Sequence, residues 1–372
     1  MAEHDTRLRR GARRPEGAPP GLRRHAHRLA PVRRRLRLDL LAVAVILVAT
    51  LGAGFAPTTA GAALAAPPLA SGHGLRIDSS VRTDARTVDV RVWSASINRQ
   101  AGVRILLPDG YDQHPTRHYP VLYLLHGGAG TWTDWTSLGA AASTAGREVI
   151  VVMPDGGKGG WYTDWQNFGA GGAPRWETFH ISSLVPWVDA NLRTIPTKQG
   201  RGIAGLSMGG YGAMNYAGRH PELFAAASAY SGAVDINNDP LRILMTVSPI
   251  IDGMAPGRIY GIYPFDSLRR LKSNPWQLAP NYRGMRISLY TGNGLPGPLD
   301  APIQDPITLG AGTIQEGVVY ASNIALDRRL TSLGIAHTLH AYGNGQHSGA
   351  YWARDLADDV PGIVGALQPA AG

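Results

Sequence analysis

The run at residues 202–212, Gly-Ile-Ala-Gly-Leu-Ser-Met-Gly-Gly-Tyr-Gly, constrains the fold of this chain more than any other part of its sequence. It sets one serine, Ser207, between Gly205 and Gly209 in the spacing G-x-S-x-G. A serine is lifted from the end of a strand onto the first turn of a helix only by a strained bend, where nearby side chains would collide. The two glycines remove those side chains, so the run predicts a strand, a tight turn and a helix, with Ser207 as a nucleophile.

Short apolar or β-branched runs alternate with helix-like stretches through most of the chain. The runs lie at residues 88–93, 104–107, 121–125, 148–153, 202–204, 225–231, 287–290 and 337–341, and the helix-like stretches include residues 176–192, 211–218 and 314–333. Strands that alternate with helices form a mainly parallel sheet with helices on both faces, and sites form at the carboxyl ends of its strands. The sequence therefore predicts an α/β fold in a single domain.

The net positive charge of the chain comes from its first 38 residues. The net charge is +9, and residues 1–38 hold 12 arginines against three acidic residues, so the remainder is formally neutral. A neutral body offers no phosphate-binding face, and we expect no nucleic-acid partner. The chain has no cysteine, which excludes disulfides and a cysteine nucleophile.

An apolar stretch at residues 40–56 follows the arginines and leads into small residues at A-x-A spacing. This order is typical of an export signal, here with a long basic first part, and an uncleaved membrane anchor is the alternative. We expect residues 1–65 to be the signal, residues 66–76 a linker, and residues 77–365 the catalytic domain. The protein would then be secreted or held at the cell envelope.

A serine nucleophile needs a histidine base and an acid that orients the base, and after this type of turn the chain order is Ser, acid, His. His337 and His340 fall in the predicted last strand, where they read as ordinary strand residues. His347 lies in the loop directly after that strand, from which a base can reach the turn. The sequence therefore predicts His347 as the base.

Spacing does not decide the acid. Asp300, Asp305 and Glu316 all lie between the strand at residues 287–290 and His347. Glu316 heads the helix-like stretch before the last strand, which could direct its carboxylate toward His347. Asp300 and Asp305 lie in a proline-rich loop, and we expect them to face solvent.

Two backbone N–H groups must stabilise the oxyanion that forms during acyl transfer. One normally belongs to the residue after the nucleophile, here Met208, and the other to a loop after an early strand. Residues 124–130 have that form, a buried strand that runs into glycines, and Gly128 is the predicted second donor. No group of histidines or carboxylates has metal-ligand spacing, so neither a metal nor another cofactor is implied.

Further motifs follow in a fixed order along the chain. They are Met-Pro-Asp-Gly-Gly at 153–157, Trp-Tyr-Thr-Asp-Trp at 161–165, Trp-Glu-Thr-Phe at 176–179, Gly-Leu-Ser-Met at 205–208, Gly-Asn-Gly at 292–294, and Asn-Gly-Gln-His-Ser at 344–348 with Tyr351-Trp352. In this order the chain resembles the esterase D-like family, and most of all its secreted actinobacterial branch, which includes the antigen 85 mycolyltransferases. The resemblance covers roughly residues 85–360. It implies the α/β-hydrolase fold and a Ser-Glu-His triad in which the acid is Glu316.

Three positions depart from the mycolyltransferases. His126 stands where they carry an aspartate, Gly349 where they carry a tryptophan, and Gly209 where they carry a serine. The His126-Gly127-Gly128 run is instead similar to the ordinary esterases of the superfamily, such as S-formylglutathione hydrolases and feruloyl esterases. Trehalose is therefore not favoured as an acceptor.

His126, Trp135 and Trp165 are the candidates for contact with the substrate. The alternative for most of the indoles is that they brace loops against the sheet.

Three functions are consistent with these features. The first is a secreted serine esterase that acts on an ester or acyl-lipid substrate. The second is an acyltransferase that moves a fatty acyl group to a sugar or glycerol acceptor of the cell envelope. The third is a non-catalytic surface binding protein on the same fold.

Overall fold

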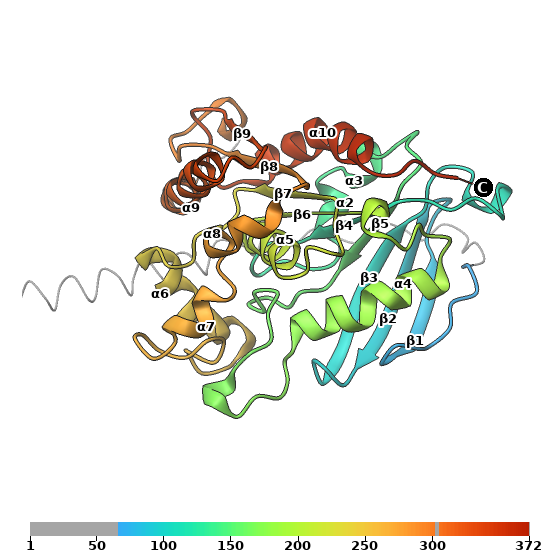
Figure 1. Cartoon of the computed structure of the whole chain (residues 1–372), viewed down its shortest axis with the longest axis horizontal. Helices are drawn as coiled ribbons and strands as arrows, with labels where there is room; N and C mark the ends of the chain where they lie inside the picture. The colour runs from blue at the N-terminus through green and yellow to red at the C-terminus, as the bar shows by residue number, and fades with distance from the viewer. Residues whose placement is uncertain (1–65, 302–304, 372) are drawn as a thin grey trace, which may run out of the picture. The chain divides into compact units, whose positions relative to one another are not determined.

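The computed structural model describes residues 66–301 and 305–371. The predicted export segment at residues 1–65 lies outside the described residues. A sheet of nine strands runs through the described part in the order β1-β2-β3-β5-β4-β6-β7-β8-β9 (Figure 1). The strands are β1 (Leu75–Arg82), β2 (Thr87–Ser94), β3 (Arg99–Leu106), β4 (Val121–Leu125), β5 (Ile150–Pro154), β6 (Arg201–Leu206), β7 (Ala226–Tyr230), β8 (Arg286–Thr291) and β9 (Thr338–Ala341).

Strand direction divides the sheet into two parts. The pairs from β5 through β4, β6, β7 and β8 to β9 are parallel. The pairs β1-β2, β2-β3 and β3-β5 are antiparallel. In the first two pairs, the short connections between the strands leave no room for a crossover helix. The predicted mainly parallel sheet is confirmed, with an antiparallel extension at one edge.

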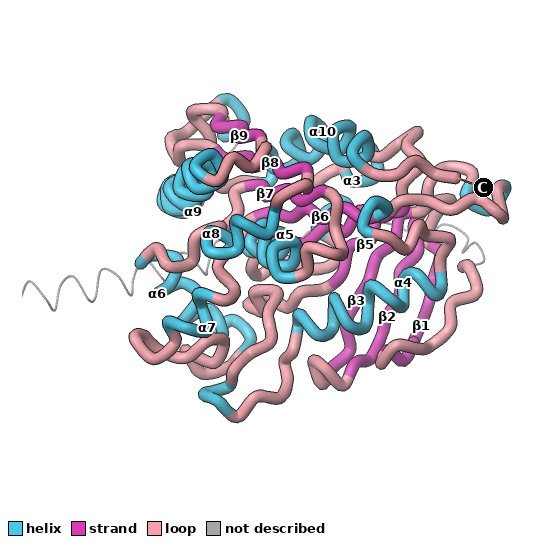
Figure 2. The backbone as a smooth tube through the Cα atoms, in the orientation of Figure 1, coloured by secondary structure: helices cyan, strands magenta, loops and turns pink. Residues whose placement is uncertain are grey.

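Helices cover both faces of the sheet (Figure 2). The regular helices are α2 (Asp134–Ser137), α3 (Ala140–Ser143), α4 (Val185–Asn191), α5 (Met208–Arg219), α6 (Asp239–Val247), α7 (Ser267–Leu271), α8 (Pro275–Leu278), α9 (Pro306–Ser332) and α10 (Gly349–Ala366), and a π-helix spans Thr178–Leu184. Alternate residues of β4 enter different clusters, since Val121 and Tyr123 pack with α4, α5 and α9, whereas Leu122 packs with α2, α3 and α10. This two-sided burial explains the continuous apolar run in the sequence.

The N-terminal boundary lies earlier than expected. Strand β1 begins at Leu75, whereas the domain was predicted to begin at residue 77. Part of the expected linker is also fastened to the domain, because the indole N–H of Trp187 donates to the Ala70 carbonyl at 2.8 Å and the Ala70 N–H donates to Asn191 Oδ1 at 2.6 Å.

Within residues 66–301 and 305–371, the helices lack the length and apolarity needed to cross a membrane.

Candidate active site

Ser207 occupies the bend between β6 and α5. Its backbone has φ 52° and ψ −117°, a conformation that costs free energy for a residue with a side chain. A Cβ on Gly205 would lie 2.3 Å from the Gly209 carbonyl oxygen, and a Cβ on Gly209 would lie 2.2 Å from the Leu125 carbonyl oxygen. Backbone atoms cannot swing aside, so both glycines are required by the bend.

Gly205→Ala is therefore expected to lower the free energy of unfolding by about 1–3 kcal/mol or more, because the added methyl group overpacks the bend. The matched control is Gly310→Ala in α9, where an added Cβ meets nothing within 4 Å. That change is expected to be neutral or stabilising by up to about 1 kcal/mol, because alanine favours the helix. Urea unfolding of both variants measures the two effects, and equal stabilities would contradict the assignment of the bend.

Two hydrogen bonds join Ser207, His347 and Glu316. His347 Nε2 lies 2.8 Å from Ser207 Oγ, and His347 Nδ1 lies 2.7 Å from Glu316 Oε2. The side chains of His347 and Glu316 are 2% and 0% exposed, so water does not compete for these bonds. A carboxylate cannot donate, so Nδ1–H donates to Glu316 and Nε2 is left to accept the Ser207 proton.

Glu316 is held in place through its second oxygen. Glu316 Oε1 accepts hydrogen bonds from the Gly292 N–H at 2.8 Å, from Thr291 Oγ1 at 2.9 Å and from Ser231 Oγ at 2.9 Å. Three donors to one oxygen stabilise the ionised carboxylate and fix its orientation. Thr291 ends β8 and Ser231 directly follows β7, so the sheet itself aims the carboxylate at His347.

The sequence placed Glu316 at the head of its helix, and this was wrong. Helix α9 begins ten residues earlier, at Pro306, because Asp305 caps it by accepting the Thr308 N–H at 2.9 Å. Glu316 therefore projects from the interior of a long helix that packs against the sheet. A helix interior is a firmer support for a carboxylate than a terminal turn.

The other candidate acids have different partners. Asp300 is 2% exposed, which contradicts the expectation that it faces solvent. It accepts hydrogen bonds from the Gly297 N–H at 2.8 Å and from Tyr351 Oη at 3.1 Å. Asp305 is exposed and caps α9.

His337 and His340 are also engaged elsewhere. His337 Nε2 lies 3.0 Å from Asp327 Oδ1, and the His340 ring stacks on Tyr290 with centroids 4.1 Å apart.

Gly128 and Met208, the two predicted oxyanion donors, lie at the same pocket as Ser207 and His347. Met208 is the first residue of α5, so its N–H has no partner within the helix. The loop that carries Gly128 is braced on one side by the Ala129 N–H, which donates to the Lys158 carbonyl at 2.7 Å. A helix N-terminus and a braced loop are suited to hold two donors toward one oxyanion.

His126 lies beneath this loop and does not line the pocket, which corrects its prediction as a substrate contact. It is 1% exposed. Its Nε2 accepts the Gly156 N–H at 2.8 Å, and its carbonyl accepts Tyr162 Oη–H at 2.9 Å. The ring therefore ties the oxyanion loop to the loop after β5, and its nitrogens are occupied by the backbone.

Trp135 and Trp165 are likewise buried, at 1% and 2% exposure, and line no part of the pocket. Trp135 packs edge-on against Tyr230 in the cluster beneath α10. Trp165 donates its indole N–H to the Gly160 carbonyl at 3.1 Å. Both indoles brace the fold, and Trp161 is the indole that lines the pocket.

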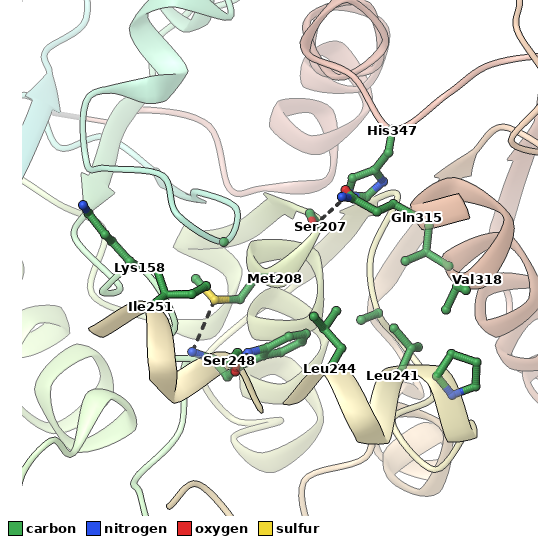
Figure 3. A pocket seen from close by; sticks show the side chains of 15 residues that line it. Lys158, Ser207, Met208, Leu241, Leu244, Ser248, Ile251, Gln315, Val318 and His347 are labelled. Carbon is green, nitrogen blue, oxygen red and sulfur yellow. Dashed lines mark hydrogen bonds between the residues drawn. The ribbon is translucent and has the colours of Figure 1, made fainter. Parts of the chain in front are cut away.

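A cleft leads away from Ser207 and encloses about 600 Å³, part of it open to solvent. Figure 3 shows Ser207 facing His347 at one side of the cleft, with Leu241, Leu244 and Val318 along another. The lining residues are Gly128, Lys158, Trp161, Ser207, Met208, Ala233, Pro240, Leu241, Leu244, Ser248, Ile251, Gln315, Val318, Val319 and His347. Most of this surface is apolar, as in sites that take acyl chains or other apolar groups.

The wall formed by α6 was missed by sequence reasoning. A signal was present, because Asp239-Pro240 is a typical helix start and Leu241, Leu244 and Met245 follow at helical spacing. Within the described residues, no group of three or more His, Asp or Glu side chains could hold a metal ion.

Known proteins share this architecture. The chain is 37% identical over 306 residues to esterase Rv1288 of Mycobacterium tuberculosis, covering 81% of this chain and 63% of that relative. It is 31% identical over 223 residues to the diacylglycerol acyltransferase/mycolyltransferase Ag85A of Mycobacterium ulcerans, covering 56% of this chain and 61% of that relative. The chain thus spans less than two thirds of the length of these relatives.

The crystal structure of Mycobacterium tuberculosis MPT51 superposes with a TM-score of 0.62 at 23% identity, covering 77% of this chain and 100% of that chain. An S-formylglutathione hydrolase from Agrobacterium tumefaciens superposes with a TM-score of 0.60 at 16% identity, covering 78% of this chain and 99% of that chain. At these identities the likeness concerns the fold, and it confirms the predicted α/β-hydrolase fold.

The family model described as putative esterase matches residues 94–363, which hold Ser207, His347, Glu316 and the whole pocket. The chain therefore belongs to the putative esterase family.

Proposed function

We propose that this protein is a serine esterase that hydrolyses carboxylic esters through an acyl-enzyme on Ser207. The observation that carries the proposal is the pair of hydrogen bonds from Ser207 through His347 to Glu316, at 2.8 and 2.7 Å, at one side of an apolar cleft. Membership of the esterase family supports it independently.

The acylation step follows from this geometry. His347 Nε2 takes the Ser207 proton as Oγ attacks the ester carbonyl carbon, and the imidazolium is stabilised by Glu316. The N–H groups of Met208 and Gly128 hold the oxyanion; each such donor contributes about 2.7–4 kcal/mol to transition-state stabilisation. When the tetrahedral intermediate collapses, the ester C–O bond breaks and the alcohol leaves with the proton held by His347.

In deacylation, water takes the place of Ser207 as the nucleophile. A water molecule gives one proton to His347 Nε2 as its oxygen attacks the acyl carbon. The bond to Ser207 Oγ then breaks, Ser207 recovers its proton from His347, and the carboxylic acid is released.

Acyl transfer is the second candidate function. An alcohol can replace water in deacylation without any change in the catalytic groups, and the likeness to a diacylglycerol acyltransferase/mycolyltransferase supports this route. Gly349 weighs against a close copy of that activity, since the mycolyltransferases carry a tryptophan at this position.

One assay separates the candidates. p-Nitrophenyl esters of graded chain length are incubated with the enzyme, with and without glycerol or trehalose, and the products are quantified by mass spectrometry. Hydrolysis predicts free acid in proportion to released nitrophenol under all conditions. Acylated glycerol or trehalose that appears at the expense of free acid would replace the esterase proposal with the transferase. Absence of turnover with every ester would favour the binding protein.

The apolar cleft is proposed to hold the acyl chain. Leu244→Trp places a larger side chain in the cleft beside α6, and it is expected to lower kcat/KM for p-nitrophenyl decanoate by about ten-fold or more. p-Nitrophenyl acetate is the internal control, because its two-carbon acyl group is much shorter than the decanoyl chain, and its kcat/KM should stay within about three-fold. Equal losses on both esters would show that the cleft does not take the chain.

We propose that the domain acts outside the cytoplasm, either released or held at the cell envelope. The arginine-rich and apolar segments at residues 1–56 support export. The intact mass of the protein recovered from the medium and from the envelope fraction tests this. Recovery of the unprocessed chain from the cytoplasm alone would overturn the proposal.

A further inference from the structure

Large apolar side chains project into solvent beside the cleft. Phe265 is 90% exposed and Leu268 is 76% exposed. Four more in the turn at residues 167–169 and the segment at residues 250–268 are exposed by more than half, whereas the exposed Leu295 and Ile307 belong to other segments. The six residues of these two segments are termed the apolar rim: Phe168, Ile250, Ile262, Tyr263, Phe265 and Leu268. Solitary exposed apolar residues are ordinary, but a group of this size on one part of a surface marks an interaction site.

Contacts between elements position three members of the rim. The Arg242 guanidinium lies over the Tyr263 ring, 4.2 Å from its centroid, which joins the loop at residues 257–266 to α6. A Cβ on Gly257 would lie 2.9 Å from Ile262 and 3.4 Å from Phe168, so both side chains border the same glycine. The turn at Asn167–Gly169 therefore brings Phe168 next to Ile262, and the other four members lie in the same segment as Ile262, residues 250–268.

The exposure of the rim does not arise from a loose loop. Ile259 and Tyr260, in the same loop, are 1% and 5% exposed, and Tyr260 Oη lies 2.8 Å from Tyr211 Oη of helix α5. At the other end of the loop, Asp266 and Arg270 form a buried ion pair. The inner half of the loop is anchored in the core, so its outer half presents apolar side chains from a fixed base.

The segments that carry or contact the rim also contribute to the wall of the cleft. Ile250 belongs to the rim, and its neighbour Ile251 lines the cleft. Helix α6 has the same double role, since Leu241 and Leu244 line the cleft (Figure 3). On the same helix, Arg242 contacts Tyr263. The rim and the cleft therefore lie close to each other on the segments around α6.

The charges around the rim favour an anionic occupant. Asp239 and Asp266 are in ion pairs with Arg242 and Arg270. Among residues 66–301 and 305–371, Arg269 and Lys272 have no ion-pair partner, and both are exposed. Apolar side chains that project from a fixed loop beside unpaired cations fit an interface where headgroups are negative and acyl chains lie just below.

We propose that the apolar rim, with Arg269 and Lys272, docks the domain onto an anionic lipid surface so that the cleft opens toward the lipid. Docking of this kind does not require turnover at Ser207. Insertion of Phe265 and Leu268 supplies apolar burial, and the two cations select a surface with negative headgroups.

Because the chain has no cysteine, a single introduced thiol can carry an environment-sensitive fluorophore. Phe265→Cys is labelled in the full chain, in a Ser207→Ala background, and titrated with vesicles of phosphatidylglycerol or of phosphatidylcholine. The matched control is Val81→Cys, an exposed valine on edge strand β1. This control also removes any contribution of the N-terminal segment, which both variants share.

With phosphatidylglycerol vesicles, the label at position 265 is expected to shift to the blue and brighten about three-fold or more, while the label at position 81 stays as in buffer. Adding Arg269→Gln and Lys272→Gln to the labelled Phe265→Cys protein is expected to raise the lipid concentration at half-saturation by about thirty-fold, because each cation near the surface contributes about 1 kcal/mol.

The proposal is overturned by equal changes at both labelled positions, by no change at position 265, or by a change in buffer alone that grows with protein concentration, which would indicate a second copy of the chain. Hydrolysis of soluble p-nitrophenyl acetate by the protein with wild-type Ser207 is measured separately, so failure of docking and failure of the esterase proposal are distinguishable.

Discussion

Ser207→Ala is expected to lower kcat for p-nitrophenyl esters by about 10⁶-fold, as loss of the nucleophile does in other serine hydrolases. The physical reason is that Ser207 Oγ lies 2.8 Å from His347 Nε2. Among the described residues, no other hydroxyl forms a hydrogen bond with this nitrogen. The remaining groups can still bind the ester and hold an oxyanion, so a residual rate above that in water is expected. Steady-state kinetics on freshly purified protein measures the loss.

Ser248→Ala is the matched control. Ser248 lines the same cleft and is 2% exposed, but its Oγ accepts the Trp161 indole N–H at 2.7 Å and has no basic partner. Its loss removes two neutral hydrogen bonds, the one from Trp161 and one to the Met245 carbonyl at 3.2 Å, each worth about 1 kcal/mol of stability, and kcat should stay within about ten-fold of wild type. If the Ser207→Ala protein keeps more than about one hundredth of the wild-type rate, Ser207 is not the nucleophile.

Glu316→Gln is expected to lower kcat by about 10⁴-fold, which corresponds to about 5.5 kcal/mol. The three donors around Glu316 Oε1 require an oxygen at that position, so the glutamine nitrogen must occupy the position of Oε2. That nitrogen donates, so His347 Nδ1 must accept and its proton moves to Nε2. Nε2 then faces Ser207 with a proton and cannot act as the base.

Asp300→Asn is the matched carboxylate control. Asp300 is also buried, but its hydrogen bonds go to Gly297, Tyr351 and Ser348 and none goes to the His347 ring. This change is expected to lower the melting temperature and leave kcat within about ten-fold. Near-normal kcat in Glu316→Gln combined with loss of kcat in Asp300→Asn would reverse the assignment of the acid.

The sequence predicted the parts of the site that depend on local chain geometry. Ser207 was predicted from the glycines of its bend, and His347 from its place after the last strand. Both depend on a few neighbouring residues, and the hydrogen bond between Ser207 and His347 agrees with both. The acid could not be predicted in this way, because the direction of Glu316 depends on where α9 begins and on donors from two different strands.

The wrong predictions concerned side chains whose direction is set by tertiary packing. Trp135 and Trp165 are aromatic residues near the glycine-rich loops, and nothing local to them indicates whether an indole points into the cleft or into the core. His126 was judged by its place next to the oxyanion loop, yet both of its ring nitrogens are engaged by the backbone. The wall formed by α6 differs from these side chains, because the sequence does contain a local signal for it. Asp239-Pro240 is a typical helix start, and the wall was nevertheless missed.

The most direct test of the account is to map the site at which the enzyme is acylated. The protein is treated with a fluorophosphonate, digested and analysed by tandem mass spectrometry, with Ser207→Ala as the parallel sample. The account predicts one adduct per chain on Ser207 and none in the variant. An adduct on another residue, or an unmodified Ser207 in protein that hydrolyses p-nitrophenyl acetate, would contradict it.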